Sequence, residues 1–214
     1  MKTPSPNLLQ RIEDLINFDK RMFFVLLVLI FLIIRYLTDL LILQAIPGYR
    51  SLDQDGVFTY FYIFNTLNYL WTPFGLIWKF TLISFTLWIG TFMAGVKLSY
   101  KTLWQFAMIA EIIFIFPELI RLLWFLTVEA ESFMVIKNFH PLSLFSLVNP
   151  DQVAQKFHYP LAALNLFEVA YWFLLGLGVH LVGRRNYISS LLIVLSSYTL
   201  CFFLWLGFYM IVYK

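Results

Sequence analysis

The sequence predicts an all-α integral membrane protein, and both its composition and its long uncharged runs lead to this prediction. Of the 214 residues, 61% are hydrophobic and only 13% are charged, whereas a soluble domain places roughly a quarter of its residues in charge. Several runs approach the roughly 20 apolar residues that a helix needs to cross about 30 Å of hydrocarbon. This excludes soluble enzyme folds. The net charge of +3 is small and the basic residues are scattered, so a nucleic-acid-binding surface is also excluded.

The first 21 residues are expected to form a separate cytoplasmic segment, before a transmembrane domain over residues 22–214. Ser5 and Pro6 match a helix N-cap followed by proline in the first turn. The apolar residues behind them recur at helical spacing, at Leu8, Leu9, Ile12, Leu15 and Ile16. An amphipathic helix lying on the membrane surface is therefore expected, with a frayed tail as the alternative. The apolar run that follows is too long for a cleaved signal peptide.

Five segments of the transmembrane domain are long enough to span a bilayer. They cover residues 22–45, 74–96, 103–128, 160–182 and 188–212. Basic residues favour a cytoplasmic N-terminus and an outer C-terminus, because this orientation puts more lysine and arginine inside. The inner set is Lys2, Arg11, Lys20, Arg21, Lys97, Lys101, Arg184 and Arg185, and the outer set is Arg50, Lys137, Lys156 and Lys214. For a bacterium this means the cytoplasmic (inner) membrane.

Two long connections lie outside in this topology. The first contains residues 58–71, FTYFYIFNTLNYLW, which are too few to span but have the aromatic content of a membrane interface. We expect this segment to lie flat or to enter the membrane as a re-entrant helix. The second, residues 129–159, combines turn formers such as Pro141 and Pro150 with apolar residues, and a packed cap is expected there.

Charged residues inside the spans are candidates for function, because a charge in hydrocarbon is costly and needs a partner. Six of them fall between about 18 and 27 Å from the cytoplasmic ends, at 1.5 Å per residue: Arg35, Asp39, Lys79, Glu118, Arg121 and Glu168. Three are basic and three are acidic, as expected of a neutral network that joins four helices. The network is either a polar cavity for an ion, headgroup or substrate, or a structural layer that holds the bundle together.

Glu111 and Pro117 are separate candidates in the third span. Glu111 lies only about 12 Å from the cytoplasmic end, with no basic residue of a span at that depth. Burial without such a partner favours a protonated carboxyl, so Glu111 is either a proton-linked site or a hydrogen-bonded neutral acid. Pro117 removes a helix hydrogen bond and should kink the span.

The remaining residues give no sign of catalysis or of a metal or other cofactor. His140, His158 and His180 are too few and too far apart for a metal site, and no phosphate-binding loop, GxSxG or HExxH motif is present. Cys201 is the one cysteine, so no internal disulfide can form. Small residues at packing spacing are expected to serve helix contacts, at Gly90, Ala94, Ser190, Ser197 and Cys201.

Two stretches resemble the bacterial branch of the Yip1 family, which consists of small five-span membrane proteins. The first is residues 95–104, GVKLSYKTLW, a basic turn before the proline-bearing third span. The second is residues 164–190, LNLFEVAYWFLLGLGVHLVGRRNYISS, an aromatic-rich span with a glycine-bearing end and a basic turn. The resemblance implies a five-helix bundle with a cytoplasmic N-terminus. It does not imply Rab binding, because the long N-terminal region and the DLYGP-like motif of the eukaryotic relatives are missing.

The function expected from these features is that of a non-catalytic membrane protein, which organises a larger membrane assembly or forms one of its subunits. The motivation is an aromatic surface larger than a five-helix bundle needs for itself. Its partners are then the lipid bilayer and other membrane proteins, in a homo- or hetero-oligomer. The competing hypothesis is a small transporter or channel subunit that uses the buried carboxylates.

Overall fold

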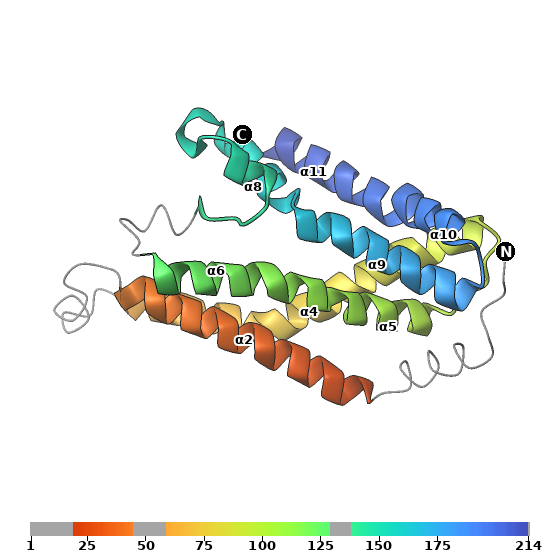
Figure 1. Ribbon diagram of the computed structural model, residues 1–214, viewed down its shortest axis with the longest axis horizontal. Coiled ribbons are helices and arrows are strands. Elements are labelled where there is room, and N and C mark those ends of the chain that lie inside the picture. Colours follow the sequence, from red (N-terminus) through yellow and green to blue (C-terminus); the bar gives the residue numbers. More distant parts are fainter. Residues whose placement is uncertain (1–18, 45–58, 129–137, 214) are drawn as a thin grey trace.

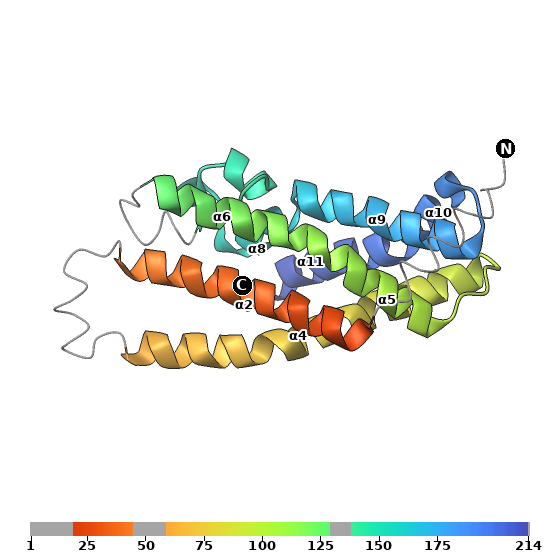
Figure 2. The same ribbon diagram turned by 60° about the horizontal axis from the view of Figure 1, so that its bottom comes forward.

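The computed structural model describes residues 19–44, 59–128 and 138–213, and within these ranges the regular structure is helical, without a β-strand. The long helices run along the long axis of the molecule as rods (Figures 1 and 2). In chain order they are α2 (Lys20–Gln44), α4 (Thr59–Met93), α5 (Tyr100–Ala110) with η1 (Glu111–Phe114) and α6 (Ile115–Thr127), α9 (Leu166–Gly183), and α10 (Tyr187–Val194) with the π-helical turn η5 (Leu195–Thr199) and α11 (Leu200–Val212). The all-helical fold class is thereby confirmed for the described residues. The expected amphipathic N-terminal helix lies outside them.

Four helices in the described part of the chain are long and apolar enough to cross a membrane, namely Lys20–Leu41, Tyr62–Met93, Leu166–Gly183 and Tyr187–Val212. This is compatible with an integral membrane protein. The third rod is not among the four, because it is interrupted at η1 and divides into pieces of 11, 4 and 13 residues.

The expected boundary near residue 74 is wrong, because the aromatic stretch is the first part of α4 and not a separate segment. Helix α4 runs for 35 residues and includes Pro73. A proline removes the hydrogen bond to the carbonyl four residues earlier, here that of Tyr69. The other bonds suffice to continue the helix, and the Thr72 hydroxyl donates to the Asn68 carbonyl at 2.9 Å. The stretch is too short to span alone, but this length argument does not apply to part of a longer helix.

The fourth expected span is divided at Asn165. Residues 160–163 belong to the short helix α8 (His158–Ala163), and α9 begins at Leu166. The Asn165 side chain accepts a hydrogen bond from the Glu168 amide at 2.8 Å and caps α9. Asparagine three residues before glutamate is a recognisable helix start, so the sequence did contain the signal for this boundary.

Pro117 lies just after a change of helix type in the third rod, and the kink expected there stays a prediction. Residues Glu111–Phe114 form the 3-10 turn η1, and Pro117 lies in the first turn of α6. Proline has no N–H to donate to the Ile113 carbonyl. One α-helical hydrogen bond is therefore missing directly after residues 111–114. The tighter turn puts Glu111 at the junction of α5 and α6, where it is buried.

The hydrophobic core lies between the second half of α4, α5, α9 and α10. Tyr171, Phe80 and Met108 are fully buried there, and the Phe80 and Trp104 rings meet edge to face at 5.5 Å between centroids. In contrast, none of the side chains described between Thr59 and Lys79 of α4 is buried. The first part of α4 therefore projects beyond the core, along α2 (Figure 2).

Only some of the small residues pack as expected. Gly90 lies against η5, where a Cβ added at Gly90 would lie 2.5 Å from Ser197 Cβ. Ser190 is fully buried, whereas Ala94 and Cys201 are exposed. The spacing of small residues thus predicted the contact between α4 and η5 correctly. It was wrong for Ala94 and Cys201, because both are exposed.

Gly90→Ala is expected to destabilise the protein by about 1–3 kcal/mol, because the new methyl group overpacks the contact with Ser197. Adding Ser197→Gly should restore much of the loss. Gly207→Ala is the matched control, since nothing lies within 4 Å of a Cβ at Gly207. Thermal unfolding in detergent measures all three variants, and a Gly90→Ala protein as stable as Gly207→Ala would contradict the packing argument.

Candidate functional site

Four of the six predicted network residues line one cavity, which we call the outer groove. It has a volume of about 330 Å³ and lies between α2, α4 and α6. Its lining residues are Arg35, Thr38, Asp39, Asn65, Asn68, Tyr69, Glu118 and Arg121. The pairs Arg35/Asp39 and Glu118/Arg121 each share a helix face, as their spacing predicted. With two basic and two acidic side chains, the outer groove is balanced in charge.

Hydrogen bonds across the outer groove join α2 to α4. The Tyr69 hydroxyl donates to Asp39 Oδ2 at 2.5 Å, and Arg35 Nη1 donates to Thr72 Oγ1 at 3.3 Å. The side chains of Arg35 and Asn68 remain exposed. The groove is thus an open polar surface on an otherwise apolar bundle.

A second cavity of about 370 Å³ adjoins the outer groove. It shares Arg35, Asn68 and Glu118 with the groove and extends to Lys79 and Glu111. Lys79 Nζ lies 2.7 Å from Glu111 Oε1, with side-chain exposures of 35% and 3% respectively. Lys79 Nζ also lies 3.8 Å from the centroid of the Phe114 ring, a cation–π contact. The ion pair therefore lies on the wall of a cavity next to the outer groove.

The expectation that Glu111 has no basic partner is wrong. The third rod begins at Tyr100, three residues earlier than expected, so Glu111 lies about 17 Å from that end and not 12 Å. This brings Glu111 closer in depth to Lys79. The long side chain of Lys79 bridges the remaining difference in depth. Glu111 is therefore the acid of an ion pair.

Glu168, the sixth predicted network residue, lies in the core on α9 and is 6% exposed. Its Oε1 accepts hydrogen bonds from the Tyr198 hydroxyl at 2.8 Å and from Trp172 Nε1 at 2.9 Å. Its charge interacts with that of Lys79, and the Tyr171 ring lies 5.5 Å from Lys79 Nζ and 5.8 Å from the Tyr198 ring. We call Lys79, Glu111 and Glu168, with Tyr171 and Tyr198 around them, the inner cluster.

The structure thus divides the predicted charged layer into two groups. The outer groove holds Arg35, Asp39, Glu118 and Arg121, while Lys79 and Glu168 belong with Glu111 in the inner cluster. Sequence reasoning missed Tyr69 and Tyr198, whose hydroxyls bind Asp39 and Glu168. Tyrosine is common in apolar helices, so neither residue stood out in the sequence.

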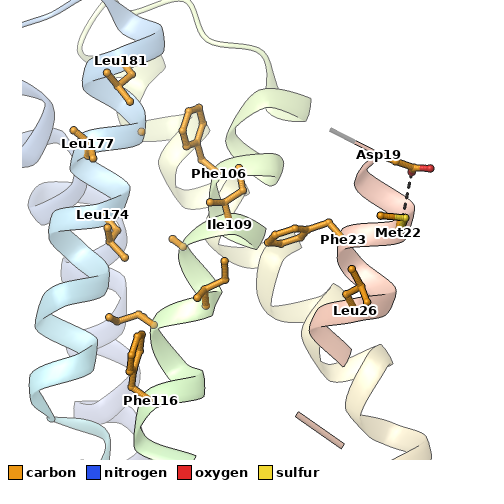
Figure 3. Close-up of a pocket in the computed structure, with 14 residues that line it drawn as sticks. Asp19, Met22, Phe23, Leu26, Phe106, Ile109, Phe116, Leu174, Leu177 and Leu181 are labelled. Carbon is orange, nitrogen blue, oxygen red and sulfur yellow. Dashed lines mark hydrogen bonds between the residues drawn. The ribbon is translucent and has the colours of Figure 1, made fainter. Parts of the chain in front are cut away.

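A larger cavity that the sequence did not reveal is apolar. It measures about 680 Å³ and lies between the start of α2, the third rod and α9. Figure 3 shows Phe106 and Ile109 facing Leu174 and Leu177 across it, with Phe23 on the α2 side. Asp19 is the one charged residue of its lining. In a bilayer this cavity suits an acyl chain or another apolar group.

The histidines of the described residues take part in local packing. No three histidine, cysteine or acidic side chains within the described ranges come together as metal ligands. Phe145, 2% exposed, lies between the His140 and His158 rings, with centroid distances of 5.6 and 4.9 Å. His180 Nδ1 is hydrogen-bonded to the Arg185 carbonyl. Residues 138–165 thereby form a packed cap around Phe145, with its own hydrogen-bonded turns.

His140 should make the protein less stable in mild acid. Burial, and then the charge of Arg121, lower the pKa of His140 below its ordinary value of 6.5. His140 is therefore neutral in the folded state, and the unfolded chain binds the extra proton as the pH falls through about 6.5. Stability is lost below that pH and unaffected above it. His140→Phe keeps an aromatic ring against Phe145, and thermal unfolding curves should show a smaller acid-induced loss than the parent protein does.

No protein-family model, no curated protein and no solved structure matches this chain.

Proposed function

We propose that this protein is a five-span integral membrane protein of the Yip1-like type, with its N-terminus in the cytoplasm and its C-terminus outside, in a bacterial inner membrane. Four apolar helices support membrane insertion. The third rod lies parallel to them and has a comparable total length, which supports a fifth crossing (Figure 1). The turns after α4 and α9 carry Lys97, Arg184 and Arg185, in agreement with the positive-inside rule.

Cysteine labelling tests this topology. In a Cys201→Ser background, Arg185→Cys and Ser146→Cys introduce thiols at two exposed positions, in the α9–α10 turn and in the cap. A thiol reagent that cannot cross membranes should modify the two from opposite sides. Modification of both from one side would refute the five-span topology.

Within the membrane the protein acts without catalysis, as an organiser or subunit of a larger assembly. The observation that carries this proposal is the projecting first part of α4. Several of its apolar side chains are more than half exposed, namely Ile63, Phe64, Leu67, Leu70 and Trp71. At 1.5 Å per residue α4 is about 52 Å long, whereas the hydrocarbon of a bilayer is about 30 Å thick.

The excess length of α4 favours a protein partner over lipid as the cover of this surface. Lipid can cover about 20 residues of a helix that stands upright, and α4 has 35. Exposed apolar side chains beyond the hydrocarbon would then face water and headgroups, and large apolar patches in such places are typical of protein interfaces. The polar outer groove beside them offers hydrogen-bonding groups to the same partner.

Cross-linking in native membranes tests the assembly. In the Cys201→Ser background, Leu67→Cys and Leu70→Cys place thiols on the projecting part of α4, at positions 59% and 64% exposed. Phe92→Cys, 76% exposed near the other end of the same helix, is the matched control. We expect a discrete adduct from the first two and none from the control. The adduct should persist in gentle detergent as a complex of defined composition.

A lone monomer in gentle detergent, without an adduct at Leu67 or Leu70, would contradict the assembly. The second candidate, a small transporter or channel subunit, is supported by the two neighbouring cavities, one lined by the outer groove and the other by Lys79 and Glu111. Solute or ion flux in liposomes that contain the purified protein alone would favour it. Loss of that flux in Glu111→Gln with the fold retained would then implicate the inner cluster.

A further inference from the structure

We propose that the inner cluster is a proton-binding site, in which Lys79, Glu111 and Glu168 together hold one proton that enters from the cavity next to the outer groove. This inference goes beyond membrane assembly and does not depend on it. It follows from the charge balance of the cluster, from an unpartnered oxygen within it and from the cavity that leads to it.

The charge balance leaves one carboxylate in excess. Lys79 supplies one positive charge against the two carboxylates of Glu111 and Glu168, which are 2% and 6% exposed. The single ion pair between described residues joins Lys79 to Glu111. An uncompensated charge in such surroundings is costly, and buried acids reach neutrality by taking up a proton. One proton on the two carboxylates makes the cluster neutral.

Charged groups on the surrounding helices do not supply the missing positive charge. Arg35 of α2 and Glu118 of α6 line the cavity next to Lys79, but they belong to the balanced outer groove with Asp39 and Arg121. The other titratable groups facing the cluster are the phenols Tyr171 of α9 and Tyr198 of η5, which are neutral. Among the described residues, the groups that face the cluster from α2, α4, η1, α6, α9 and η5 therefore leave it one positive charge short.

An independent observation is the second carboxyl oxygen of Glu111. Glu111 Oε2 is buried and has no hydrogen-bond partner in the structure. The neutral donors around the cluster are already in use: the Tyr171 hydroxyl bonds the Ala107 carbonyl at 3.3 Å, and Tyr198 and Trp172 bond Glu168. The bond from Lys79 goes to Oε1 of Glu111, the other oxygen of the carboxyl. Protonation of the Glu111 carboxyl removes the charge from a buried oxygen that no protein donor stabilises.

Access to the cluster is one-sided. Lys79 and Glu111 line the cavity next to the outer groove, and the Lys79 side chain is 35% exposed. On the far side, Tyr171 and Tyr198 are buried in the core. Protons therefore reach the cluster from the side of the cavity that Lys79 and Glu111 line.

Infrared spectroscopy of the full-length protein in liposomes tests the proposal by counting protons. A protonated carboxyl has a carbonyl stretch that ionised carboxylates lack, and this band shifts in deuterated water. At neutral pH the wild type should show one buried carboxyl band. Glu111→Gln and Glu168→Gln should each lose it completely, because either change leaves one acid to balance Lys79. Lys79→Met should double the band area, because both acids then need a proton.

Asp151→Asn, a change at an exposed acid outside the cluster, is the control and should leave the band unchanged. If Lys79→Met does not fold, Lys79→Met/Glu168→Gln replaces it and should show one band. A band that survives in both glutamine variants, or no band in the wild type, would overturn the proposal. A wild-type band that disappears when sodium replaces potassium would also overturn it, because a metal cation would then compensate the charge.

Discussion

Replacing Lys79 by methionine is expected to destabilise the folded protein by about 3 kcal/mol at neutral pH. The change removes the ammonium 2.7 Å from Glu111 Oε1 and leaves a carboxyl that is 3% exposed without its cation. Breaking a buried ion pair costs about 3–5 kcal/mol, and the lower end applies here because Lys79 is partly exposed. The loss should shrink as the pH falls, because the extra proton that the variant takes up on folding costs less free energy at lower pH. Thermal unfolding in detergent or nanodiscs measures both effects.

Two further variants isolate the pair interaction. Lys79→Met/Glu111→Gln should regain part of the loss, since the double variant no longer contains the stranded acid. Lys101→Met removes a lysine that is exposed on α5 and should change stability by less than about 0.5 kcal/mol. Equal losses for Lys79→Met and Lys101→Met would show that the ion pair contributes nothing to stability.

Hydrophobicity predicted the all-helical class and the positions of the first and last rods, because it depends on a short stretch of sequence. The rods expected at residues 22–45 and 188–212 lie at Lys20–Gln44 and Tyr187–Val212. The largest error, at α4, arose from treating length as a property of one segment. A helix continues until something ends it, and Pro73 alone does not end α4.

The candidate site was predictable within helices but not between them. Spacing placed Arg35 with Asp39, and Glu118 with Arg121, because i to i+3 and i+4 neighbours share a face in any helix. The Lys79–Glu111 pair depends on where two rods begin and on how they are rotated against each other. Hydrophobic periodicity determines neither of these precisely enough to pair individual side chains. The same uncertainty merged the outer groove and the inner cluster into a single expected network.

Substitutions of Glu168 are expected to have the second large effect on stability. Two different substitutions distinguish the contribution of its hydrogen bonds from that of its charge. Glu168→Leu removes the acceptor of both Tyr198 and Trp172. A stranded buried donor costs about 1–3 kcal/mol. The Tyr198 hydroxyl is buried and Trp172 is half-buried, so the leucine variant should lose at least about 1–3 kcal/mol.

Glu168→Gln keeps an acceptor oxygen of the same reach and also removes the excess acid of the inner cluster. We therefore expect the glutamine variant to unfold close to the wild-type temperature. If the charge of Glu168 itself held the helices together, the glutamine and leucine variants would both be less stable than the wild type. Tyr198→Phe in the Glu168→Leu background removes one stranded donor and should recover part of the loss. No recovery, together with equal unfolding temperatures for the leucine and glutamine variants, would contradict the assignment of Glu168 as a hydrogen-bond acceptor for α9 and η5.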